Sequence, residues 1–185
     1  QDEDDTLMVI EMIRALSVTI PILVDTKGPE VRTKNIEDPI ELAAGEEFVI
    51  TGDESITGDK VICVDYANFA AEIPTGTEIL IDDGEFSCEV KEQQDNQLIC
   101  IAGNDGKIKK KKSVNVPAVH ISLPALSEKD RGFVHFCAKN DVDYIIHSFI
   151  RSKKDIDEIK DILKEYPDHN VKIIAKIENR EGFDN

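Results

Sequence analysis

A block of short alternating segments, set between two stretches of a different kind, most constrains the fold of this chain. From about residue 38 to 116, short runs of alternating residues are separated by turns such as Thr57-Gly58-Asp59 and Asp83-Gly84. Regularly spaced short strands with such turns are typical of a small antiparallel barrel or sandwich. We therefore expect an all-β module with strands at about 47–50, 60–64, 78–81, 86–90 and 97–101.

The flanking stretches predict helices that alternate with buried strands. Residues 6–16 carry an apolar helical face, and Pro21–Val24 predicts a strand buried on both faces, ended by Gly28-Pro29. Beyond residue 120, Ser127 is placed to cap a helix, 144–146 and 171–177 predict strands, and Ile156–Leu163 carries another helical face. About three such strands are too few for a closed parallel barrel, which takes eight. The chain is therefore expected to be a piece of a longer protein.

The predicted fold class is α/β plus all-β. Incomplete (β/α)8 barrel segments at 1–33 and 119–185 flank a small antiparallel β-barrel domain inserted at 34–118.

Composition excludes several classes of function. Lysine plus arginine is 22 and aspartate plus glutamate is 38, giving a net charge of −16. This balance argues against binding nucleic acid or anionic lipid through bulk charge. No apolar run approaches the roughly 20 residues of a membrane helix, and the acidic start is unlike a signal peptide. The cysteines at 63, 88, 100 and 137 form no CxxC pair. We expect reduced core thiols and a cytoplasmic protein.

Charged residues cluster where the predicted parallel strands end. Lys176 interrupts an apolar run and Glu178 follows two residues later, so both side chains are expected on one face of the strand. A lysine beside a carboxylate suits a phosphorylated substrate and a divalent metal. The alternative is a simple ion pair, and spacing does not separate the two. Of the four histidines, all expected to be packing or surface residues, His147 alone lies at a strand end.

The lysine-rich run 107–112 stands out in so acidic a chain. It is either a solvated strand edge or a phosphate-binding lip. The sequence contains neither a Walker loop nor GxGxxG, so any nucleotide is held without those glycine-rich loops.

Five segments, in order along the chain, resemble the pyruvate kinase family. They are DTKGPEVRT at 25–33, KKSVNVP at 111–117, LPALSEKD at 123–130, SFIR at 148–151 and KIENREG at 176–182. Such a series is far more specific than any single motif. That family inserts a small β-barrel lid into a (β/α)8 barrel, which matches the interrupted pattern described above.

The resemblance implies roles for residues of the barrel segments. Lys176 resembles the lysine that stabilises the transferring phosphoryl group and the enolate. Glu178 resembles a ligand of Mg²⁺ or Mn²⁺, and Asp25 and Thr26 resemble K⁺ ligands. Arg32, near the end of the first barrel segment, and Lys112, in the inserted module, resemble residues that contact nucleotide phosphates. Asp83, also in the inserted module, resembles a residue that reaches the nucleotide-bound metal. The chain departs from the family pattern at Ser113, usually glycine, and at His147, often a small residue.

The function implied is phosphoryl transfer from phosphoenolpyruvate to ADP, giving pyruvate and ATP, by a parent protein that is a homotetramer. The resemblance places further ion ligands before residue 1 and after residue 185. The 185-residue chain is therefore expected to be inactive by itself. Two alternatives are an Mg²⁺-dependent lyase of the phosphoenolpyruvate/pyruvate barrel group and a non-catalytic binding module formed by 34–118.

Overall fold

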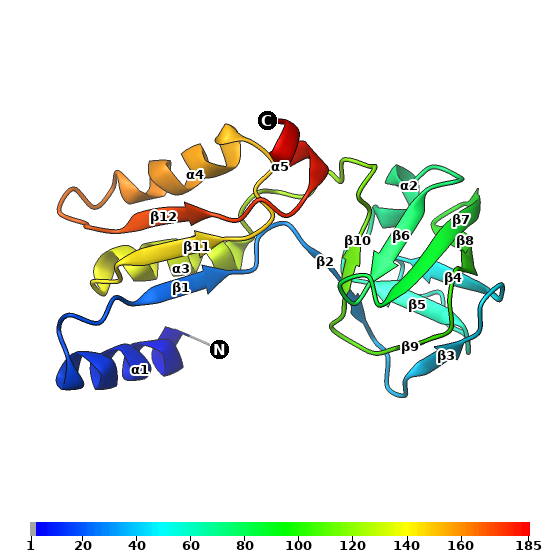
Figure 1. Ribbon diagram of the computed structural model, residues 1–185, viewed down its shortest axis with the longest axis horizontal. Helices are drawn as coiled ribbons and strands as arrows, with labels where there is room; N and C mark the ends of the chain where they lie inside the picture. Colours follow the sequence, from blue (N-terminus) through cyan, green and yellow to red (C-terminus); the bar gives the residue numbers. More distant parts are fainter. Residues whose placement is uncertain (1–2) are drawn as a thin grey trace. The chain divides into compact units, whose positions relative to one another are not determined.

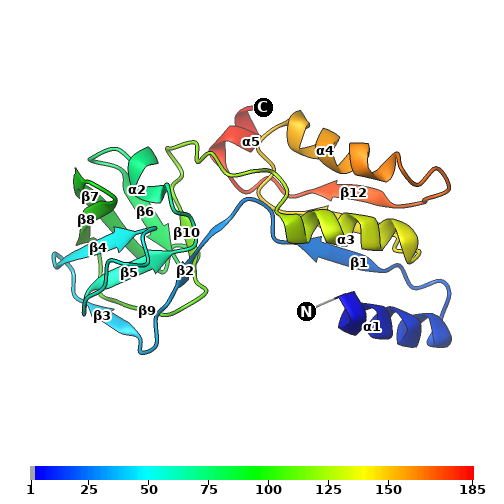
Figure 2. The same ribbon diagram turned by 180° about the vertical axis from the view of Figure 1, so that it is seen from behind.

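A computed structural model describes residues 3–185 and divides them into two compact units (Figures 1 and 2). One unit contains the described residues up to Pro29 together with Leu123–Asn185, and the other contains Glu30–Ser122. The divisions fall a few residues from the positions expected from sequence, 33/34 and 118/119. A mixed α/β unit and a closed β-barrel are both present, so the predicted fold class is confirmed.

The α/β unit is built on a three-stranded parallel sheet with the order β1-β11-β12. The strands are β1 (Leu23–Thr26), β11 (Tyr144–His147) and β12 (Lys172–Ala175). Their register aligns Thr26 with His147 and His147 with Ala175, so all three strands end at one edge of the sheet. The helices are α1 (Glu3–Leu16), α3 (Glu128–Lys139), α4 (Lys153–Leu163) and α5 (Arg180–Asp184).

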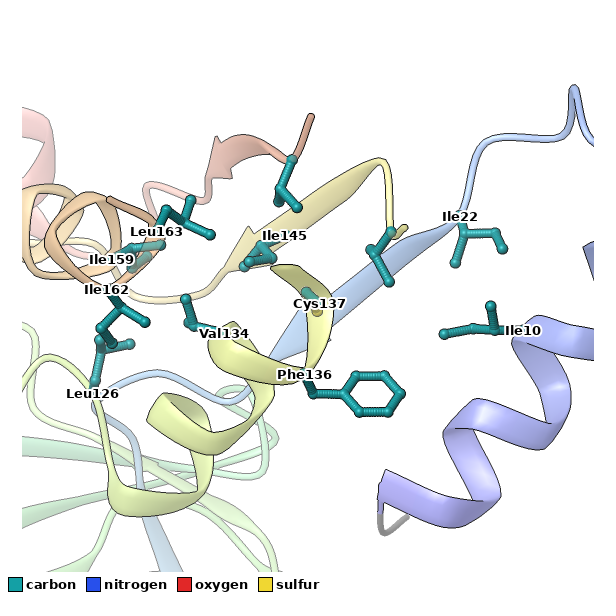
Figure 3. Packing of buried hydrophobic residues seen from close by; sticks show 12 residues of the cluster. Ile10, Ile22, Leu126, Val134, Phe136, Cys137, Ile145, Ile159, Ile162 and Leu163 are labelled. Carbon is teal, nitrogen blue, oxygen red and sulfur yellow. The ribbon is translucent and has the colours of Figure 1, made fainter. Parts of the chain in front are cut away.

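The core of this unit lies between the helices and one face of the sheet (Figure 3). Ile145 of β11, Cys137 of α3 and Ile159 of α4 are fully buried there. The alternate residues of each strand point away from the helices. Among them, Leu23 is 47% exposed and Ile174 is 37% exposed. The prediction that the first strand, at Pro21–Val24, is buried on both faces is therefore wrong for the described chain, because its helices cover only one face of the sheet.

Helices α3 and α4 begin with capping boxes, in which a serine and an acidic residue satisfy each other's backbone N–H groups. Ser127 pairs with Asp130 at the start of α3, as predicted, and Ser152 pairs with Asp155 at the start of α4. Both acidic side chains are buried, so the caps place charged oxygens where the otherwise unpaired amides need acceptors.

The second unit is a closed barrel with the strand order β10-β2-β5-β4-β8-β7-β6. Its interior is filled by aliphatic and aromatic side chains such as Ile50, Ile79 and Phe86. The strands are β2 (Val31–Lys34), β4 (Glu47–Thr51), β5 (Val61–Val64), β6 (Glu78–Ile81), β7 (Phe86–Gln94), β8 (Gln97–Ala102) and β10 (Ser113–Asn115). A separate two-stranded sheet pairs β3 (Ile40–Leu42) with β9 (Gly106–Ile108), and α2 covers Phe69–Glu72.

One strand pair departs from the antiparallel pattern. Strands β4 and β5 are parallel, with Val49 opposite Val61. An antiparallel pair needs only a tight turn, whereas the connection 52–60 is long enough to return the chain to the start of β4. The expectation of a wholly antiparallel barrel is wrong at this pair.

The four cysteines are buried free thiols, as predicted. Within residues 3–185, no helix is both long and apolar enough to cross a membrane.

Candidate functional site

Four polar side chains meet at the edge where the parallel strands end. The Lys176 ammonium donates to Ser148 Oγ at 2.8 Å, and Ser148 Oγ in turn donates to Asp25 Oδ1 at 3.2 Å. The ammonium also lies 3.6 Å from Asp25 Oδ2 and 3.5 Å from Glu178 Oε1. The result is one cation held by a hydroxyl between two carboxylates, with Lys176 37% exposed.

The sheet explains how these side chains meet. Asp25 lies in β1 on the face that the helices leave uncovered, and Ser148 follows β11 directly. Lys176 lies just beyond the end of β12, which stops at Ala175, so the expectation that Lys176 projects from within a strand is wrong. Lys176 and Glu178 instead come together in the segment between β12 and α5.

Thr26 lies on the opposite face of β1 from Asp25 and is buried. Its hydroxyl lies 2.6 Å from His147 Nδ1 and 3.2 Å from the Ile146 carbonyl oxygen. His147 Nε2 lies 3.0 Å from the Ala125 carbonyl oxygen, which can only accept, so Nε2 carries the proton. Burial lowers the pKa of His147, and in the neutral ring Nδ1 accepts from Thr26. The histidine is thus a packing residue that holds Thr26.

Glycine is required where β1 leaves the sheet. Gly28 has φ +69°, and a Cβ placed on it would lie 2.1 Å from the Ser148 carbonyl oxygen. A side chain at this position would therefore be strained in its own backbone and would also collide with the segment that holds Lys176.

In the barrel unit, the predicted Arg32, Lys112 and Asp83 all lie around β10. Arg32 is opposite Ser113 in the β2–β10 pair. Its Nε donates to Glu30 Oε2 at 2.7 Å, and its Nη1 donates to the Lys111 carbonyl oxygen at 2.8 Å. Glu30 is nearly buried, with 5% of its side chain exposed, whereas the Arg32 side chain is 40% exposed.

Contacts between the start of β10 and the turn that follows β6 hold both Lys112 and Asp83. Lys112 Nζ lies 2.6 Å from Asp82 Oδ2, and this carboxylate raises the pKa of the lysine. Ser113 Oγ donates to Asp83 Oδ1 at 2.9 Å and accepts from the Asp83 backbone N–H at 3.0 Å. A glycine at position 113 could make neither bond, so the departure at Ser113 fixes the turn that carries Asp83.

The run 107–112 includes the short strand β9 and the turn that leads to β10. Lys107 pairs with Glu41 on the neighbouring strand, and Lys109–Lys111 are exposed. The solvated-edge interpretation holds for Lys107, while the Lys112 backbone N–H donates to Thr33, the residue after Arg32.

Comparisons with known proteins decide the family. A family model described as "Pyruvate kinase, barrel domain" matches residues 2–185. The chain belongs to the pyruvate kinase family. It is 44% identical over 185 residues to the pyruvate kinase of Borreliella burgdorferi, covering 100% of this chain and 39% of that protein. It is 41% identical over 170 residues to the pyruvate kinase of Geobacillus stearothermophilus, covering 90% of this chain and 29% of that protein. The pyruvate kinase of Clostridium perfringens is 40% identical over 182 residues, covering 95% of this chain and 38% of that protein.

This member of the pyruvate kinase family therefore spans well under half the length of the relatives it matches. The family resemblance expected from the five motifs is confirmed, and the matched region includes both units of the fold.

Sequence reasoning missed several members of the site. Ser148, which bonds both Asp25 and Lys176, lies in the SFIR segment, and its position directly after a predicted strand was the available signal. The backbone N–H of Phe149 donates to Glu178 Oε2 at 3.0 Å, and nothing in the sequence pattern indicated that contact. The acidic partners Glu30 and Asp82 are visible only in the folded chain.

Proposed function

We propose that a protein carrying this chain transfers the phosphoryl group of phosphoenolpyruvate to ADP, giving pyruvate and ATP. The observation that carries the proposal is the placement of Lys176. Ser148 fixes its ammonium at 2.8 Å, at the edge where parallel-barrel enzymes bind substrates. A fixed, partly exposed cation stabilises negative charge that develops on a transferring phosphoryl group and on an enolate.

The carboxylates beside Lys176 suit cations as well. Glu178 offers an oxygen to a divalent ion such as Mg²⁺ or Mn²⁺, which when bound would offset charge on phosphoryl oxygens. Within residues 3–185, no three acidic, histidine or cysteine side chains are grouped closely enough to hold a metal by themselves. That fits Mg²⁺, which is commonly held by one or two carboxylates and completes its shell with water and substrate phosphates.

For K⁺, Asp25 offers its carboxylate. The side chain of Thr26 faces His147, on the opposite face of β1 from Asp25, so we assign the backbone carbonyl of Thr26 to the ion. Both residues lie at the end of one strand, which places these two oxygen donors next to each other in the chain.

Arg32 and Lys112 are proposed to contact the phosphates of ADP, with Asp83 near its metal. Each cation is now neutralised by a carboxylate, Glu30 or Asp82. A phosphate must therefore compete with those partners, and a phosphate with bidentate geometry and more charge can do so. We further propose that the parent protein is a cytoplasmic homotetramer and that the 185-residue chain is inactive by itself.

The test is the formation of pyruvate by a full-length protein carrying this chain. Lys176→Met should lower kcat by about 10²–10³-fold, the loss typical of removing one group that stabilises transition-state charge. The matched control is Lys172→Met at the start of β12, where the lysine lies over the Tyr144 ring and away from the cluster. A Lys176→Met enzyme that keeps a tenth or more of its kcat would contradict the proposal. Steady turnover by the purified 185-residue chain would contradict the expected inactivity.

A further inference from the structure

The strained backbone at Phe149 lies beside the proposed metal ligand. Phe149 has φ +56°, in the left-handed region that bulky residues rarely adopt. Of the other non-glycine residues with positive φ in 3–185, Lys111 is one and the rest are asparagine or aspartate, which tolerate this region well. Phe149 is therefore the one aromatic residue of the described chain held in this conformation, and the surrounding structure must impose it.

The pairing of β11 with β12 shows what imposes it. The Lys176 N–H donates to the His147 carbonyl oxygen at 2.9 Å. In regular parallel pairing, the next bond would run from the N–H of Phe149 to the carbonyl oxygen of Lys176. Instead the N–H of Ile150 makes that bond, at 3.1 Å. Phe149 is thus one extra residue in the ladder, a bulge.

The bulge frees one backbone donor, and that donor faces Glu178. The Phe149 N–H lies 3.0 Å from Glu178 Oε2, while Oε1 of the same carboxylate lies 3.5 Å from the Lys176 ammonium. One oxygen of Glu178 is therefore fixed by an amide, and the other faces the cation of the cluster. Without the extra residue, the amide would be used up in the ladder.

The segment is anchored on both sides of Phe149. Before it, Ser148 bonds Lys176 and Asp25. After it, the Ile150 carbonyl oxygen accepts from Asn179 Nδ2 at 3.2 Å. Because both neighbours are held, the backbone between them cannot relax by moving the amide away from Glu178.

We propose that the bulge at Phe149 is a positioning device: its backbone N–H holds the Glu178 carboxylate in the orientation that binds a divalent cation. Phe149 acts through Glu178 and is a positioning residue. This inference rests on the proposed function, because it takes Glu178 to be a metal ligand. Partners that orient a metal ligand are typically worth 10–100-fold in metal affinity.

The test removes the donor and leaves the side chain in place. In a full-length protein carrying this chain, the Phe149 amide is replaced by an ester through incorporation of phenyllactic acid. Mn²⁺ affinity is then measured without turnover, by electron paramagnetic resonance. The matched control is an ester at Ile150, which deletes the ladder bond to Lys176 and leaves the bond to Glu178.

We expect about tenfold weaker Mn²⁺ binding for the Phe149 ester and less than about threefold for the Ile150 ester. Equal effects of the two esters, or none at Phe149, would overturn the inference. Glu178→Gln is measured alongside: if it leaves Mn²⁺ binding unchanged, the proposed metal site fails. If Glu178→Gln weakens binding and the Phe149 ester does not, only the positioning role fails.

A second comparison tests the bulge without metal. At φ +56° glycine is unstrained and alanine is not, so Phe149→Gly should be more stable to urea than Phe149→Ala. This reverses the usual order of the two residues. A more stable alanine variant would show that the left-handed conformation is not imposed, and would overturn the argument.

Discussion

Replacing Gly28 with alanine tests whether the close approach of two strand ends holds the cluster together. Two costs arise from one methyl group. The left-handed conformation, φ +69°, costs an L-residue about 1–2 kcal/mol. The new Cβ would also lie 2.1 Å from the Ser148 carbonyl oxygen, whereas ordinary contact begins at 3.4 Å. Forcing apart two packed segments costs about 1–3 kcal/mol more.

We therefore expect Gly28→Ala to destabilise the α/β unit by about 2–5 kcal/mol. Catalysis should fall as well, because Ser148 carries the hydrogen bond to Lys176. The matched control is Gly45→Ala in the barrel unit. Gly45 has φ +81°, and apart from Gly45 and its two chain neighbours no heavy atom of the described residues lies within 4 Å of a Cβ built there. Only the backbone cost of about 1–2 kcal/mol applies to that variant.

Amide hydrogen exchange resolved by mass spectrometry is the appropriate assay, since it reports the opening of each unit separately. Pyruvate formation by the full-length protein gives the second readout. Equal destabilisation by the two alanines would refute the steric part of the reasoning. A destabilised Gly28→Ala variant with unchanged kcat would refute the coupling between this contact and Lys176.

Two further predictions concern titratable groups. Asp143 accepts from the Ile22 N–H at 2.7 Å and from Arg14 at 2.8 Å, and these bonds lower the pKa of its carboxyl group. A lowered pKa stabilises the fold above the unfolded value, near 4, and this contribution is lost as the pH falls through the folded value. Asp143→Asn should therefore unfold in less urea than the unchanged protein at pH 7, with the difference shrinking below about pH 4; a difference independent of pH would contradict this. Burial raises the pKa of the Cys137 thiol to about 12, so this buried thiol should react with a chromogenic disulfide reagent at pH 8 only after unfolding, and rapid labelling of the folded chain would contradict it.

Local sequence patterns predicted those strands and helix ends whose signal lies in a few consecutive residues. Turn residues between alternating runs predicted five strands of the barrel, and Ser127 predicted the start of α3. The strands β2, β3, β9 and β10 were not predicted, because each of these short runs has only one or two apolar residues, too few to separate it from a loop.

The family and its candidate residues were also available from the sequence, since motif order needs no coordinates. Lys176, Glu178 and Asp25 do meet, as expected for residues at the carboxyl ends of strands in one parallel sheet. What sequence could not supply is the pairing register. It is register that sets Ser148 between Asp25 and Lys176, and a shift of one residue would turn each side chain to the other face.

Tertiary structure alone decided the finer points of the site. His147 meets Thr26 because parallel pairing places them side by side on the helix-covered face, although 120 other residues separate them in the chain. The extra residue at Phe149 is invisible in any periodicity, because a bulge is defined by the partner strand and not by the bulged one. Patterns in the chain report what each residue prefers locally, whereas the positions of Lys176 and Glu178 depend on hydrogen bonds from segments far away in the sequence.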